Sequence, residues 1–208
     1  MSKLFHSKGG QELIQKMNKL ANYLIISLLW SVCSLPIITI GAATSAMYLT
    51  LHKCVEGEKD YILQTYFQAF KNTFVYSTII WTSYLVVLFI FMINQGLLEM
   101  GLAHSPMNQF SQIFLMIICI CVLPFLITTF GYVSRFTDGF RQAISHSFIF
   151  SIIHIKSMMT ILFILLCTIA LIWLVPLLTV ILPAFSMYKI YQKLEIIYTQ
   201  YIPDGLGE

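Results

Sequence analysis

The sequence contains few charged residues. Asp, Glu, Lys and Arg together make up 10% of its 208 residues, whereas hydrophobic residues make up 58%. An ordinary soluble domain carries roughly 25% charged residues, and a soluble chain of this length could not bury so much apolar surface. The composition therefore predicts an integral membrane protein. The net charge of +3 comes from scattered lysines that form no basic cluster, so we expect no nucleic-acid partner.

The motifs of common enzymes and metal sites are also missing. The five histidines show no HxxxH or HExxH spacing, and the five cysteines form no CxxC pair. These absences give a zinc site or a disulfide framework no support. No Gly-rich phosphate loop and no Ser-His-Asp order stands out either. We therefore predict no catalytic residue, no metal site and no cofactor, and we expect a protein that is not an enzyme.

The sequence does contain four long apolar blocks, at residues 21–52, 73–94, 110–133 and 157–188. The second and third blocks each match the roughly 20 residues that cross a bilayer once. The first and last blocks contain 32 residues each. As single helices they would be about 48 Å long, against a hydrocarbon core of about 30 Å. Neither of these two blocks fits one ordinary span.

Both long blocks carry the same interruption near their middle. Pro36 to Thr39 reads PIIT, and Pro176 to Thr179 reads PLLT at a constant offset of 140. Proline removes a backbone donor and disfavours helix in the residue before it. Threonine can cap a new helix by accepting hydrogen bonds from its free N–H groups. We therefore predict that these four residues break each block into a helical hairpin.

A group of small residues follows the first break, at Gly41, Ala42, Ser45 and Ala46. Residues 41 and 45 are spaced i, i+4, as are residues 42 and 46, so on a helix the four share one face. Small residues permit close approach between helices in a membrane. This face is interpreted either as a packing surface for the neighbouring helix of the hairpin or as a docking surface for another protein.

The distribution of lysine and arginine predicts the path of the chain, because cytoplasmic loops are enriched in both. Basic residues lie in segments 1–20, 53–72, 134–156 and 189–208, whereas segment 94–109 contains none. Only one path of the chain through the membrane places the four basic segments in the cytoplasm and segment 94–109 outside. Each long block leaves the cytoplasm and returns, and each of the two central blocks crosses once. Both termini are then cytoplasmic.

These features predict an all-α, polytopic integral membrane protein with a single domain at residues 1–208. It has a cytoplasmic N-terminal segment at 1–20 and a cytoplasmic tail at 189–208. About six helices are expected, with the two proline-broken hairpins flanking a central pair of spans. The hairpins are either full spans or shallow re-entrant pairs, depending on how far their flanks extend the helices.

The stretch SLPIITIGAATSAMY, from Ser34 to Tyr48, precedes a Phe-rich segment at Phe67, Phe70 and Phe74. In these features the chain resembles the YesL-like family of small bacterial membrane proteins. The family has no established biochemical activity, and its members are typically encoded beside carbohydrate ABC importers and glycoside hydrolases. The resemblance implies a bacterial plasma-membrane protein that works as an accessory membrane subunit.

The sequence indicates two candidate functions. The first is a non-enzymatic accessory or regulatory subunit associated with a carbohydrate ABC importer, with membrane lipids and the importer permease as partners. The alternative is a small solute carrier or channel centred on the two broken hairpins, because broken helices form binding sites in transporters. The two central spans contain no Asp, Glu, Lys, Arg or His, and six short helices enclose only a small cavity, which favours the first function.

Overall fold

The structure is a computed structural model and describes residues 8–56, 61–99, 106–136 and 139–201. Within these ranges the regular secondary structure is all helical, which confirms the predicted class. Three short segments connect the helices: the 3-10 turns η1 (Ile37–Thr39) and η3 (Pro176–Val180) and the π-helical segment η2 (Leu51–Glu56). Seven α-helices are described: α2 (Lys8–Cys33), α3 (Ile40–Thr50), α4 (Ile62–Glu99), α5 (Pro106–Arg135), α6 (Phe140–Ile153), α7 (Ile155–Leu174) and α8 (Leu182–Tyr201).

The count of seven α-helices in the described ranges differs from the expected six. The additional helix is α6, which lies in segment 134–156, where a cytoplasmic loop was expected. Its buried residues are Ala143, Ser147 and Phe150, a spacing that places them on one face. A kink at His154 (φ −105°, ψ 45°) separates α6 from α7. The segment is therefore a helix that buries one face, and its polar residues resembled those of a loop.

Three helices in the described part of the chain are long and apolar enough to cross a membrane. The segments are Ile62–Gly96 in α4, Phe110–Arg135 in α5 and Ile155–Leu174 in α7. The first two contain the spans predicted at 73–94 and 110–133. With 38 residues, α4 is about 57 Å long, nearly twice the thickness of a hydrocarbon core. These helices fit a membrane protein.

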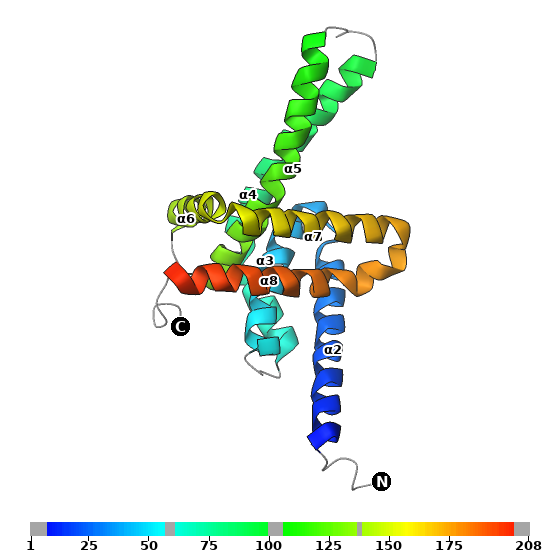
Figure 1. Ribbon diagram of the computed structural model, residues 1–208, viewed down its shortest axis with the longest axis vertical. Helices are drawn as coiled ribbons and strands as arrows, with labels where there is room; N and C mark the ends of the chain where they lie inside the picture. Colours follow the sequence, from blue (N-terminus) through cyan, green and yellow to red (C-terminus); the bar gives the residue numbers. More distant parts are fainter. Residues whose placement is uncertain (1–7, 57–60, 100–105, 137–138, 202–208) are drawn as a thin grey trace.

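The helices extend in different directions (Figure 1). The upper parts of α4 and α5 form a hairpin that projects beyond the other helices, while α2 extends the opposite way. The helices α7 and α8 lie next to each other, and both run across the direction of α4 and α5. The short helix α3 lies near the centre, where these directions meet.

The central helix α3 is enclosed by its neighbours, and nine of its eleven residues are buried. Trp30 of α2 donates a hydrogen bond to Thr44 Oγ1 (3.2 Å). Tyr66 of α4 donates to the main-chain oxygen of Ala43 (3.2 Å). The residues at the start of α3 are small, so these larger helices can pack close to its backbone. The core of the protein is therefore built around α3.

The first predicted break coincides with a change in backbone structure. The helix α2 ends at Cys33, η1 follows Pro36, and α3 begins at Ile40. Thr39 precedes α3, but its hydroxyl makes no capping bond to that helix. It instead donates to the main-chain oxygens of Cys33 (2.6 Å) and Pro36 (2.7 Å). The predicted capping role of this threonine is therefore wrong: it binds carbonyl groups at the end of α2.

The second break has the same local structure. The helix α7 ends before Pro176, η3 contains the PLLT sequence, and Thr179 Oγ1 donates to the main-chain oxygen of Pro176 (2.6 Å). A proline that cannot continue a helix and a threonine that binds its carbonyl thus occur twice in the chain. The two breaks are predicted to form the turns of hairpins in the membrane, either fully spanning or re-entrant, and this stays a prediction.

Candidate functional site

The small-residue face lies inside the protein, against α4. Gly41, Ala42, Ser45 and Ala46 are all buried. A Cβ atom on Gly41 would lie 2.6 Å from the main-chain oxygen of Ser77 and 2.8 Å from Trp81 Cβ. The Oγ atoms of Ser45 and Ser77 are 2.7 Å apart, within hydrogen-bonding distance. In this structure α4 occupies the face, so another protein has no access to it.

A cluster of polar side chains lies where α5, α8 and η2 meet, and the sequence patterns did not indicate it. Arg135, the last residue of α5, forms an ion pair with Glu195 of α8. The same guanidinium nitrogen, Nη1, lies 3.2 Å from Nε2 of His52 in η2. His52 Nδ1 lies 2.8 Å from the hydroxyl of Tyr191. We call these four residues the polar cluster.

Two contacts of the polar cluster constrain its histidine. Nη1 of Arg135 lies 3.3 Å from Nδ1 and 3.2 Å from Nε2 of His52. Arginine has only donors, so the ring nitrogen that accepts from it must be unprotonated. Either nitrogen can be that acceptor, because the hydroxyl of Tyr191 can donate to Nδ1 or accept from it. A hydrogen bond from Arg135 to either nitrogen requires a neutral His52. In this state one positive and one negative charge balance within the cluster.

A shell of tyrosines surrounds the ion pair. The ring of Tyr48 lies 5.3 Å from that of Tyr191 and 6.4 Å from that of Tyr198. The Tyr48 hydroxyl donates to the second carboxylate oxygen of Glu195 (3.4 Å). Burial, and then the nearby charge of Glu195, raises the pKa of Tyr198 well above its usual value. The phenol therefore stays neutral and donates to the main-chain oxygen of Thr128 (2.8 Å).

The polar cluster joins segments that are distant in the sequence. The side chains of Arg135 and Glu195 are only 20% and 18% exposed, so much of their hydration has been lost. Partial burial makes such a pair costly to break, because removal of one partner leaves the other charge uncompensated. The π-helical geometry of η2, which carries His52, is rare and often marks functional sites. This cluster is the candidate functional site.

One sequence signal for the cluster was present in α8. Glu195 follows Tyr191 by four residues and precedes Tyr198 by three, so the three share one helix face. Tyr191 and Tyr198 are buried, together with Leu194 between them. An acid on an otherwise apolar helix face requires a partner. That partner, Arg135, is remote in the sequence, so the spacing alone does not identify it.

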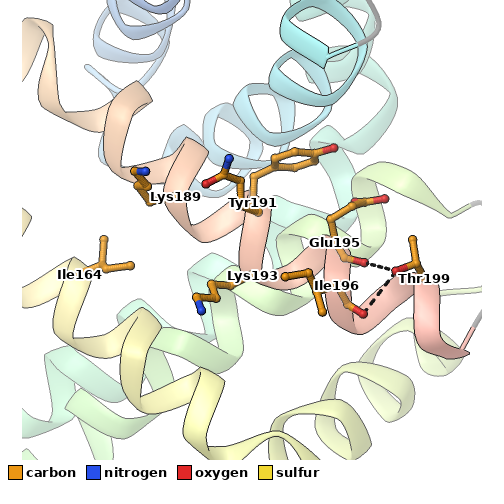
Figure 2. A pocket seen from close by; sticks show the side chains of 8 residues that line it. Ile164, Lys189, Tyr191, Lys193, Glu195, Ile196 and Thr199 are labelled. Atoms are coloured by element: carbon orange, nitrogen blue, oxygen red, sulfur yellow. Dashed lines mark hydrogen bonds between the residues drawn. The ribbon is translucent and has the colours of Figure 1, made fainter.

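The charged and hydrogen-bonding groups of the polar cluster contact one another. Among the residues that the structure describes, no group of three or more His, Cys, Asp or Glu is placed to hold a metal ion. Glu195 and Tyr191 also line an open groove of about 760 Å³ on the outer side of α8 (Figure 2). The cluster is arranged to hold η2, α5 and α8 together beside this groove.

The all-helical fold and its three helices of spanning length fit an integral membrane protein. Residues 23–95 match the family described as "Protein of unknown function, DUF624". The matched part includes the last part of α2, the first break, α3 and nearly all of α4. No match was found among curated proteins or among solved structures. The chain is therefore similar to this family over its first broken segment and its first predicted span.

Proposed function

We propose that this protein is a non-enzymatic accessory or regulatory subunit of a membrane complex. The observation that carries the proposal is the uncovered hairpin of α4 and α5. In the most apolar window of each helix, only 17% of α4 and 33% of α5 is buried within the chain. The exposed side chains are large and apolar, for example Phe89 and Ile93 on α4 and Ile113 and Ile117 on α5. In a membrane these surfaces are available for packing against the helices of another protein.

The proposed partner is the permease of a carbohydrate ABC importer. The support is the likeness of the Ser34–Tyr48 stretch to the YesL-like family, whose members are typically encoded beside such importers. The same likeness supports a bacterial plasma membrane as the location, and the lysine pattern supports cytoplasmic termini. Because α4 covers the small-residue face, the exposed apolar faces of α4 and α5 are the proposed docking surface.

A solute carrier is the second candidate, and one contact favours it. Ser31 in α2 lies beside the second break, with its Oγ 3.4 Å from the main-chain oxygen of Thr179. The end of α2 thus lies near η3, and adjacent broken helices form substrate sites in several transporters. Against this function, Trp30 near the end of α2 donates a hydrogen bond to Thr44 of α3, so these two helices contact each other directly. The accessory function remains the main proposal.

Co-purification tests the main proposal. The tagged chain would be purified in mild detergent, and the proteins retained with it would be identified by mass spectrometry. We expect an importer permease with the native chain. Retention should fall about tenfold with Phe89→Ala and Ile93→Ala combined, a loss of roughly 1.4 kcal/mol in binding free energy.

The matched control is Phe163→Ala with Leu166→Ala, which removes exposed apolar side chains from α7 instead. This control should retain the permease, and both variants should remain in the membrane fraction. Equal retention by the α4 variant would contradict the docking surface. Uptake of a sugar by the isolated chain in liposomes would overturn the accessory function in favour of the carrier.

A further inference from the structure

The groove on the outer side of α8 combines basic and apolar surface. Its volume is about 760 Å³. Figure 2 shows Ile164 of α7 facing the side of α8 that carries Lys189 and Lys193. The groove is lined by Ile164, Lys189, Tyr191, Gln192, Lys193, Glu195, Ile196 and Thr199. It is therefore formed where an apolar helix meets a helix with a polar outer surface.

The charge of the groove is positive. Lys189 and Lys193 are spaced i, i+4 and both are exposed. The acid among the lining residues is Glu195, and its charge is paired with that of Arg135 in α5. The ammonium of Lys189 lies 5.9 Å from the ring centroid of Phe185, which orients the side chain without removing its charge. The two lysines therefore present positive charge that Glu195 does not cancel.

The apolar side of the groove continues into a surface suited to lipid. Outward-facing residues of α7 include Phe163, Leu166 and Leu171, all exposed. The helix that carries them is apolar and long enough to cross a membrane. On α8 the exposed residues that line the groove are Lys189, Gln192, Lys193, Ile196 and Thr199. The groove therefore lies between the apolar surface of α7 and the lysines of α8.

We infer that this groove binds the headgroup of an anionic phospholipid. The phosphate pairs with Lys189 and Lys193, the amide of Gln192 supplies a further donor, and the acyl chains lie along the exposed surface of α7. Basic pockets between helices on the cytoplasmic side of a membrane bind anionic headgroups in this manner. Lys189 and Lys193 also belong to segment 189–208, which is predicted to be cytoplasmic, where anionic lipids attract basic residues.

The shape of the groove favours a lipid over a soluble phosphate compound. The groove is open along one side, and Ile164 and Ile196 form apolar parts of its wall. A small soluble anion would leave this apolar surface in contact with water, whereas a phospholipid covers it with its chains. The inference needs only the isolated chain, so it does not depend on the proposed partner.

Native mass spectrometry of the full chain in detergent tests the inference. The chain would be mixed with equal amounts of phosphatidylglycerol and phosphatidylcholine, and the retained lipid counted. We expect preferential retention of phosphatidylglycerol. The preference should fall about tenfold in the double variant Lys189→Gln and Lys193→Gln, because both ammonium groups are lost. Lys189→Arg with Lys193→Arg should keep it, since the positive charge remains.

A matched control removes the same charge elsewhere, at the exposed residues Lys53 and Lys71. Lys53→Gln with Lys71→Gln should retain phosphatidylglycerol like the native chain. An unchanged preference in the Lys189 and Lys193 double variant would overturn the inference, as would an equal loss in the control. Excess glycerol phosphate should displace no lipid. Displacement by this soluble compound would show that the groove recognises free phosphate esters instead.

Discussion

Arg135 and Glu195 form an ion pair that fastens the end of α5 to the middle of α8. The pair lies beside His52, so one guanidinium contacts both a carboxylate and an imidazole. The Tyr48 hydroxyl binds the other oxygen of the carboxylate, which links α3 to the same point. Four segments of the chain are thus held by a few polar contacts in a mostly apolar protein.

Arg135→Ala should destabilise the protein. The change leaves the carboxylate of Glu195 without its counter-charge at a site where it is only 18% exposed. Breaking a fully buried pair costs about 3–5 kcal/mol, so we expect about 2–3 kcal/mol at this partly exposed site. Thermal or denaturant unfolding in detergent measures the loss. The double variant Arg135→Ala with Glu195→Gln should recover part of it, and strictly additive losses would show that the two residues do not interact.

Gly41→Leu should destabilise the chain itself. Even the first side-chain atom would lie 2.6 Å from the main-chain oxygen of Ser77, so α3 and α4 would have to separate. Overpacking of this kind costs about 1–3 kcal/mol. At Gly96 an added Cβ meets nothing within 4 Å, so Gly96→Leu is the matched control and should leave stability nearly unchanged. Unfolding of both variants in detergent provides the comparison. A stable Gly41→Leu protein that loses only a partner would restore the docking interpretation of this face.

Pro36→Ala combined with Thr39→Leu should allow α2 to continue into α3. The change restores a backbone donor and removes the hydroxyl that binds the carbonyls of Cys33 and Pro36. A continuous helix would carry residues 53–60 across the membrane or cause degradation. Expression level and thiol labelling of a cysteine at position 58 report the outcome. Pro183→Ala, within the first turn of α8, should change neither, because proline is tolerated there. Unchanged labelling and expression in the double variant would show that other residues set the turn.

Thiol labelling in intact cells tests the predicted topology. In a chain without its native cysteines, a cysteine at position 102 should react with an impermeant reagent, and one at position 58 should not. The reason is the absence of lysine and arginine in 94–109 and their presence in 53–72. Both test positions lie outside the described residues. The reverse pattern of labelling would rule out a cytoplasmic N-terminus.

The sequence predicted the helical class and two of the three possible spans. Residues 73–94 and 110–133 are apolar over a bilayer's thickness, a signal that depends on composition alone. The extents of α2 and α6 were not predicted, because their polar residues were interpreted as cytoplasmic segments. Segments of this kind become helices when one apolar face packs against neighbours, as at Ala143 and Phe150.

Local sequence patterns could not predict the polar cluster. In the sequence, Arg135 indicated only that segment 134–156 is cytoplasmic, and His52 was examined only as part of a metal-binding motif. Their relation to Glu195 depends on how η2, α5 and α8 approach one another, which no periodicity in the chain specifies. The small residues near Gly41 did indicate close packing between helices. The identity of the packing partner, α4, required the three-dimensional arrangement.

The length of α4 gives the protein a mechanical property. The helix runs for 38 residues and contains no proline, so it acts as one stiff rod. Near its start, Tyr66 is bound to α3, and further along, Trp81 donates to the main-chain oxygen of Ile37 (2.7 Å) in the first break. A force applied where the rod projects beyond the other helices would be transmitted to those two contacts. Movement of the projecting end of α4 would thereby reach α3 and the first break.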